Sequence, residues 1–190
     1  MNPMTSDSGP LSMDGAKAHI GALEKNLPVQ VIMVPFTVDH RYEPKHPVVL
    51  RINPKRQVPV LVHDAVEIFD STQIFEYFEA LQLQPQPQPR LWPQAPAHRA
   101  EARRLELKSD EVFFPSVIRL MSLQDRLDDP LAQEAIVQLH SYYWQMESLL
   151  SDRTHLAGGY TYADIAFFMA QIFAARFGAP MTAATPCTLA

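Results

Sequence analysis

One continuous stretch of the chain predicts how its N-terminal part folds. Residues 50–81 read LRINPKRQVPVLVHDAVEIFDSTQIFEYFEAL. Two short β-branched and apolar runs, 58–62 and 66–69, flank a polar turn, which is typical of two short strands. The apolar residues of 74–81 recur at helical spacing, and Asp70 and Ser71 precede them as N-cap residues. The stretch therefore predicts a loop, a strand, a turn, a second strand and a helix.

Two features of this stretch point to more than folding. Pro59 removes a donor from a strand ladder, which indicates a bend, an edge strand or a cis bond; an ordinary trans proline is the base-rate alternative. At the helix start, free N–H groups and the helix dipole favour an anion, while the Asp70 carboxylate favours an ammonium group. Asp70 and Ser71 would together suit the head group of an amino acid. A plain helix cap is the alternative.

Composition limits the class of protein. The chain has 190 residues, 47% of them hydrophobic and 19% charged, which suits one large or two small globular domains. A net charge of −5 argues against nucleic-acid binding. The single cysteine, Cys187, excludes a disulfide framework and a Cys-rich metal site, so we expect no metal. No apolar run reaches transmembrane length, and we expect a cytoplasmic protein that does not enter a membrane.

The N-terminal residues predict alternating strands and helices. Residues 1–8 are polar and show no alternation, so we expect at best a weak first strand. Ser12 can cap a helix that runs to residue 26, with a stripe of Ala16, Ile20, Leu23 and Leu27. A β-branched run within 28–38 predicts the next strand. Together with residues 50–81, the order is βαβ followed by ββα.

These motifs resemble a known family. Asn-Pro-x-x-x-Val-Pro-Val-Leu at 53–61, two short strands, an acid-Ser pair and an amphipathic helix resemble the glutathione-binding half of glutathione S-transferases. The resemblance implies a thioredoxin-like N-terminal domain over residues 1–83. It also implies that the Val58-Pro59 bond is cis and that the Val58 backbone pairs with the cysteinyl part of glutathione. Asp70 and Ser71 would hold its γ-glutamyl end, and Gln57 lies in the loop that lines the glutathione cleft in relatives.

The loop before the first helix carries a second resemblance. Ser12-Met13-Asp14-Gly15-Ala16-Lys17 is similar to the Thr/Ser-x-Asn-Gly-x-Lys loop of the nu-like class and related bacterial transferases. The resemblance makes Ser12 the catalytic hydroxyl that stabilises the glutathione thiolate. Asp14 stands where that class often has asparagine, and its negative charge would work against a thiolate.

The rest of the chain predicts a linker and an all-helical domain. Residues 84–96 are rich in Gln and Pro and predict an extended linker, and residues 97–190 predict the helical C-terminal domain. Pro115 should kink or interrupt its first helix. By resemblance, Phe113, Phe114 and Val117 on that helix would face the electrophile, although core packing is the alternative for each. Thr161 and Asp164 form a capping box with a folding role.

The resemblance implies an enzyme that conjugates glutathione, as co-substrate, to a small hydrophobic electrophile. It further implies a homodimer. Two other functions stay open. A glutathione-dependent disulfide reductase would use the same loop, and a non-catalytic glutathione-binding or scaffold protein would keep the fold without turnover.

Overall fold

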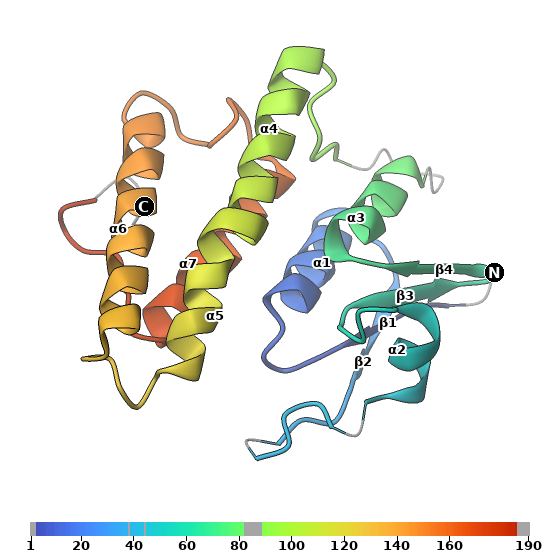
Figure 1. Cartoon of the computed structure of the whole chain (residues 1–190). Helices are drawn as coiled ribbons and strands as arrows, with labels where there is room; N and C mark the ends of the chain where they lie inside the picture. The colour runs from blue at the N-terminus through green and yellow to red at the C-terminus, as the bar shows by residue number, and fades with distance from the viewer. Residues whose placement is uncertain (1–2, 38, 44, 82–88, 186–190) are drawn as a thin grey trace. The chain divides into compact units, whose positions relative to one another are not determined.

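The chain folds into two compact units, Met1–Arg90 and Leu91–Ala190. The computed structural model describes residues 3–37, 39–43, 45–81 and 89–185 (Figure 1). The expected linker 84–96 lies partly outside these ranges, and its described residues 89–95 form neither helix nor strand. Within the described ranges, no helix is long and apolar enough to cross a membrane.

The first unit is built on a four-stranded mixed sheet. Its strands are β1 Met4–Ser8, β2 Val29–Met33, β3 Val60–His63 and β4 Val66–Phe69, in the order β2-β1-β3-β4. β1 and β2 are parallel, whereas β3 is antiparallel to both β1 and β4. The predicted thioredoxin-like βαβ-ββα order is therefore confirmed.

The expectation of a weak first strand is wrong. β1 is a central strand, with β2 on one side and β3 on the other. Every residue of β1 except the half-buried Thr5 is buried. Backbone groups of any residue can form a ladder, so a polar run becomes a strand when partners flank it on both sides.

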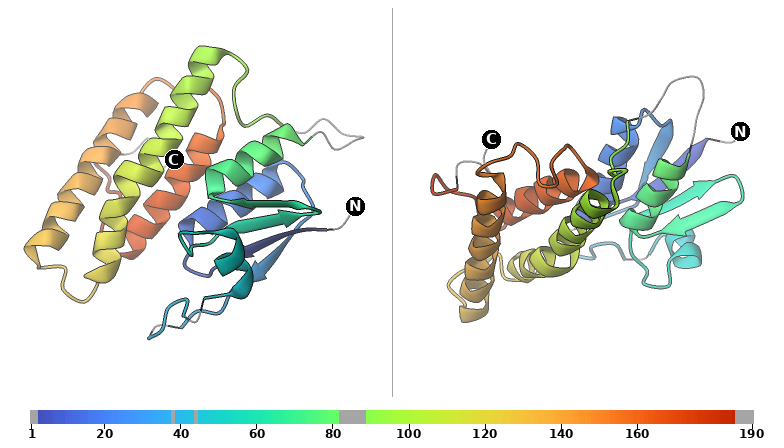
Figure 2. Two further views of the ribbon diagram at one scale, coloured as in Figure 1. Left: turned by 45° about the vertical axis from the view of Figure 1, so that its right-hand side comes forward. Right: turned by 90° about the horizontal axis from the view of Figure 1, so that it is seen from above.

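Three helices cover the sheet: α1 Met13–Glu24, α2 Pro47–Ile52 and α3 Ser71–Ala80. α1 and α3 lie together on one face and α2 lies on the other (Figure 2). On the α2 side, Val34, Val49 and Val60 form a buried apolar cluster. The expected apolar stripe of α1 is wrong in part, because Leu23 is 60% exposed while Ala18, Gly21 and Ala22 are buried. The buried face of α1 thus combines the small residues Ala18, Gly21 and Ala22 with Met13 and Lys17, which are also buried.

The second unit consists of helices α4 Pro96–Lys108, α5 Phe114–Ser122, α6 Pro130–Leu150 and α7 Tyr162–Arg176. A π-helical turn, η1 Ser109–Phe113, joins α4 to α5 and is followed by Pro115 in the first turn of α5. Pro115 was predicted to interrupt the helix, and it does so because proline has no N–H for the preceding turn. Around η1, Phe113 packs against Tyr142 and Tyr143 of α6 and Phe167 of α7.

The start of α7 confirms the predicted capping box. Thr161 is the N-cap and Asp164 is the third residue of the helix. The Asp164 carboxylate accepts hydrogen bonds from the Thr161 N–H at 2.8 Å, the Thr161 hydroxyl at 2.9 Å and the Leu156 N–H at 2.9 Å. Asp164 thus fixes both the helix start and the loop before it.

Candidate functional site

The register of the sheet brings three distant segments to one edge. Asp7 of β1 lies opposite Val60 of β3. Because the two strands are antiparallel, Pro59, which precedes Val60, lies beside the C-terminal end of β1. Val60 also lies opposite Phe69 of β4, so Pro59 is beside Asp70 as well. The loop before α1, the start of β3 and the start of α3 therefore meet at one edge of the sheet. Ser12, Val58 and the Asp70-Ser71 pair belong to these three segments.

Ser12 is the N-cap of α1, as predicted. Its hydroxyl oxygen accepts a hydrogen bond from the Gly15 N–H at 3.0 Å, and its own N–H donates to the Gly9 carbonyl at 3.1 Å. Gly15 leaves room for the Ser8 side chain, because a Cβ at this position would lie 2.0 Å from the Ser8 hydroxyl oxygen and would force it to move. With its oxygen already an acceptor, the Ser12 hydroxyl can still donate its proton to an anion. An anion at this place would also gain from the positive end of the α1 dipole.

The first turn of α1 also contains Asp14, which is half-buried. A carboxylate in the first turn stabilises the helix through the dipole. It also lies two residues from Ser12, where its negative charge would disfavour a thiolate.

The Val58-Pro59 peptide bond is cis, as predicted. Pro59 is buried and Val58 is half-buried. The ladder between β1 and β3 begins at Val60, so Val58 lies outside it. The backbone of Val58 is thus placed where an extended peptide could pair with it as an added strand.

Asn53 holds the loop that leads to Val58. Its side-chain amide donates to the Gln57 carbonyl at 2.6 Å, and its side-chain oxygen accepts from the Lys55 N–H at 2.9 Å. Asn53 is itself buried, whereas the side chains of Lys55, Arg56 and Gln57 are exposed. In the sequence, Asn53 stands out only as the first residue of the Asn-Pro motif at 53–61.

Asp70 and Ser71 begin α3. Asp70 is the N-cap, and its Oδ1 accepts from the Thr72 N–H at 3.0 Å and the Gln73 N–H at 3.2 Å. The backbone of Asp70 has φ 77°, which is rare for a residue other than glycine and clusters at functional sites. Asp70 is exposed, while Ser71 is buried. The pair presents a carboxylate beside a positive helix end, as an amino-acid head group requires.

The three residues expected to face an electrophile separate into two environments. Phe113 and Val117 are one helical turn apart and are both buried, 2% and 0% exposed, in the core of the second unit. Phe114 is rotated by about 100° from Phe113 on a helix and is half-buried. Its ring lies 6.0 Å from that of Phe173 on α7. Of the three, Phe114 alone has the partial exposure that contact with a ligand requires.

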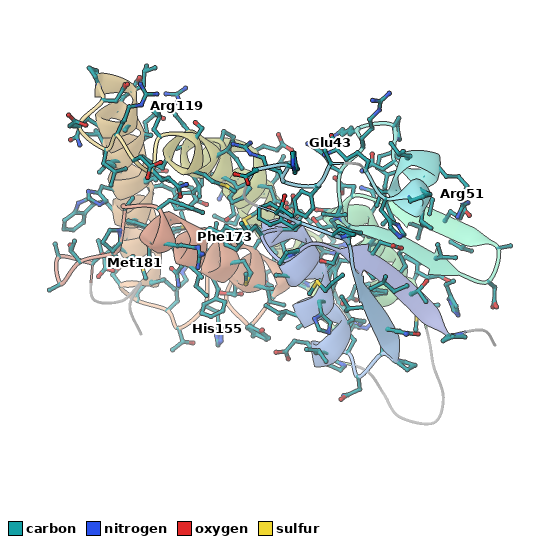
Figure 3. All side chains as sticks on the ribbon, turned by 90° about the horizontal axis from the view of Figure 1, so that it is seen from below. Glu43, Arg51, Arg119, His155, Phe173 and Met181 are labelled. Carbon is teal, nitrogen blue, oxygen red and sulfur yellow. The ribbon has the colours of Figure 1, made fainter. Side chains whose placement is uncertain are left out.

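A buried acid under the site was not expected from the sequence. Asp7 of β1 is 2% exposed, and its Oδ1 lies 3.1 Å from Nδ1 of His46, the residue before α2. Burial raises the pKa of Asp7, and His46 and then Arg51 on α2 (Figure 3) act against that rise. Neither the polar run around Asp7 nor the loop around His46 carries a sequence signal for this pair, because it forms only when the sheet and α2 come together.

Among the described residues, no group of three His, Cys, Asp or Glu side chains could hold a metal ion. Cys187 lies outside the described residues.

The chain is similar to known proteins. Residues 15–81 match the family model described as glutathione S-transferase, N-terminal domain. No curated protein sequence matches the chain. Three solved structures have the same fold. A glutathione S-transferase from the Antarctic clam Laternula elliptica is 22% identical, with a TM-score of 0.80 over 99% of this chain and 85% of that one.

The other two structures come from bacteria. A glutathione S-transferase from Methylobacillus flagellatus, solved with glutathione bound, is 22% identical, with a TM-score of 0.75 over 91% of this chain and 83% of that one. The β-etherase LigF from Sphingobium sp. strain SYK-6 is 23% identical, with a TM-score of 0.79 over 99% and 92%. The first unit therefore belongs to the glutathione S-transferase N-terminal domain family, and the chain as a whole has the glutathione S-transferase fold, a thioredoxin-like domain followed by a helical one.

Proposed function

We propose that this protein is a glutathione transferase that joins the glutathione sulfur to a small hydrophobic electrophile. The observation that carries the proposal is the meeting of three segments at one edge of the sheet. They offer a hydroxyl donor at a helix start, a stretch of backbone just outside the β1–β3 ladder, and a carboxylate beside a second helix start. These three features match the thiol, the peptide backbone and the amino-acid end of glutathione in turn.

Each group has a separate task in the proposed reaction. The Val58 backbone pairs with the cysteinyl residue, Asp70 binds the γ-glutamyl ammonium, and Ser71, near the positive end of the α3 dipole, binds its carboxylate. One of the exposed side chains of Lys55, Arg56 and Gln57 contacts the glycyl carboxylate. The Ser12 hydroxyl donates to the sulfur and so favours the thiolate over the thiol.

The chemical step is a displacement. The thiol loses its proton to water, and the thiolate then attacks the electrophilic carbon. The new S–C bond forms as the bond from carbon to the leaving group breaks, and the leaving group departs as an anion. A free cysteine thiol has a pKa of about 8.5, so most of it is protonated at neutral pH without such help.

Glutathione binding is tested by isothermal titration of the wild type and Ser71→Ala. Loss of a hydrogen bond to a charged group should weaken binding by about 1–3 kcal/mol, or about 5- to 150-fold in Kd. Ser122→Ala, which removes an exposed hydroxyl in the second unit, is the control and should bind like the wild type. Equal affinities in all three proteins would reject the proposed anchor.

Turnover is tested with a chromogenic aryl halide. Ser12→Ala should lower kcat/KM by about one to two decades, since a hydrogen bond to a charged sulfur is worth about 1.5–3 kcal/mol, and glutathione affinity should change little. Turnover of a model disulfide in place of the halide would identify a reductase. Tight glutathione binding with neither activity would identify a binding or scaffold protein. A weak first strand would have favoured a scaffold protein. β1 is instead a central strand paired on both sides, so this reason for the scaffold alternative no longer applies.

We also propose a homodimer, because the resembled family forms one. Analytical ultracentrifugation at micromolar concentration measures the mass directly, and a monomer at that concentration would contradict this part of the proposal.

A further inference from the structure

One tyrosine contacts the loop that carries Ser12, and nothing in the sequence motifs accounts for it. The Tyr42 hydroxyl oxygen accepts a hydrogen bond from the Leu11 N–H at 3.1 Å, although the two residues are 31 positions apart. Leu11 directly precedes Ser12. The contact therefore joins the segment between β2 and α2 to the loop between β1 and α1.

The Tyr42 ring also packs against this loop. A Cβ built on Gly9 would lie 2.4 Å from the Tyr42 hydroxyl oxygen and 2.5 Å from a ring carbon, so Gly9 leaves room for the ring. The Gly9 carbonyl in turn accepts the Ser12 N–H at 3.1 Å. Tyr42 thus touches the loop at its first residue and at the residue before Ser12.

The Tyr42 side chain is itself fixed by packing within the first unit. Its ring packs edge-on against Phe36, with ring centroids 4.8 Å apart, and lies against the buried cluster of Val34, Val49 and Val60. Backbone hydrogen bonds between Thr37 and Arg41 close the turn before it, at 2.9 and 2.7 Å. A side chain that the core fixes in this way can hold a contacting loop in one conformation.

We propose that Tyr42 is a positioning residue, which holds the loop of residues 9–12 so that the Ser12 hydroxyl faces the glutathione sulfur. This inference rests on the proposed function. The physical reason is that one hydroxyl must lie within hydrogen-bond distance of one sulfur, and a backbone loop without a fixed point spreads that hydroxyl over many positions. Tyr42 does not touch the substrate and acts through Ser12.

The test is Tyr42→Phe, which removes the hydroxyl and keeps the ring against Gly9. Loss of a neutral hydrogen bond should lower kcat/KM with the aryl halide about 2- to 10-fold. The pKa of the bound glutathione thiol, followed by ultraviolet absorbance of the thiolate, should rise by about 0.4–1 unit. The Kd of glutathione should stay unchanged, because Val58, Asp70 and Ser71 bind it independently of the loop.

Tyr77→Phe is the matched control. The Tyr77 hydroxyl is also a hydrogen-bond partner in the first unit, 2.7 Å from Nδ1 of His63, at the opposite end of β3 from Val58. Its loss should affect stability to a similar degree and leave the thiol pKa unchanged. Gly9→Ala is a second variant that disturbs the same contact, since its Cβ must displace Tyr42 or the loop. It should raise the thiol pKa as well.

A double variant decides whether Tyr42 acts through Ser12. In the Ser12→Ala background, Tyr42→Phe should cause no further change in thiol pKa or kcat/KM. A full effect in that background, an unchanged thiol pKa in Tyr42→Phe alone, or an equal effect in Tyr77→Phe would overturn the inference. These results differ from a failure of the proposed function, in which Ser12→Ala itself leaves the thiol pKa unchanged and the inference falls with it.

Discussion

The carboxylate of Asp164 should stabilise the second unit by more than an ordinary helix cap does. It accepts three hydrogen bonds, two from the N-cap residue Thr161 and one from the Leu156 N–H in the preceding loop. Thr161 is buried, so its donors have little access to water once the carboxylate is removed. Asp164→Ala leaves two backbone donors and one hydroxyl without this acceptor.

The magnitude follows from the number of bonds and their coupling. Hydrogen bonds to a charged group contribute about 1.5–3 kcal/mol each, but bonds that share one carboxylate are not additive. Asp164 is half-buried, so water can replace part of the loss. We therefore expect Asp164→Ala to lower the free energy of unfolding by about 3 kcal/mol, against about 0.5–2 kcal/mol for a simple cap. For a chain of this size, the Tm should fall by about 6–12 °C.

Tryptophan fluorescence during urea unfolding is the direct assay, because both tryptophans of the chain, Trp92 and Trp144, lie in the second unit. Trp92 also packs edge-on against Tyr162, the first residue of α7, with ring centroids 5.7 Å apart. Its signal therefore reports the region of the cap.

Two variants complete the experiment. Asp164→Asn retains one acceptor oxygen and should lose about half as much stability as Asp164→Ala. Asp152→Ala is the control, because the Asp152 side chain is 79% exposed and pairs with Arg153 at 3.5 Å, so its loss should lie within about 0.5 kcal/mol of zero. A loss below about 1 kcal/mol in Asp164→Ala, with an unchanged slope of unfolding free energy against urea, would refute the reasoning.

Three further predictions concern the first unit. Burial raises the pKa of Asp7, so its contribution to stability is fully present below the unfolded-state pKa and is lost as pH rises through the raised folded-state pKa. Asp7→Asn should therefore have a higher Tm than the wild type at neutral pH but not at acid pH. A difference in Tm that does not depend on pH would contradict this prediction. Asp14→Asn should move the limb of the pH–rate profile to lower pH, since a negative charge near Ser12 is removed, and an unshifted limb would show that Asp14 does not act on the thiol. Asn53→Ala should weaken glutathione binding several-fold in calorimetry, because the loop leading to Val58 loses its hydrogen bond to the Gln57 carbonyl, whereas wild-type affinity would mean that the loop holds its shape without it.

Local sequence patterns predicted most of the elements correctly. The strands β3 and β4, the cap of α3 at Asp70 and the cap of α7 at Thr161 all lie where short-range signals placed them. Each of these signals acts over only a few residues. Strand alternation, the N-cap hydrogen bond and the missing N–H of proline are determined by neighbours in the chain, so they can be read without the fold.

The predictions that depended on packing were less accurate. The buried face of α1 includes Ala18, Ala22 and the polar Lys17, whereas Leu23 is exposed. Phe113 and Val117 fill the core of the second unit, while the adjacent Phe114 is partly exposed. Periodicity shows which residues share a helix face, but which face is covered depends on where other elements lie.

The sequence by itself predicted the βαβ-ββα order, the caps at Ser12, Asp70 and Thr161, and the resemblance carried by residues 53–71. Only the tertiary structure decided that the polar residues 4–8 form a central strand, because their backbone groups need β2 and β3 as partners. It alone brought the segments that follow β1, precede β3 and follow β4 to the same end of the sheet, buried Asp7 beside His46, and joined Tyr42 to Leu11. The physical reason is the same in each case: the interaction is made between residues far apart in the chain, and no pattern in one segment contains its partner.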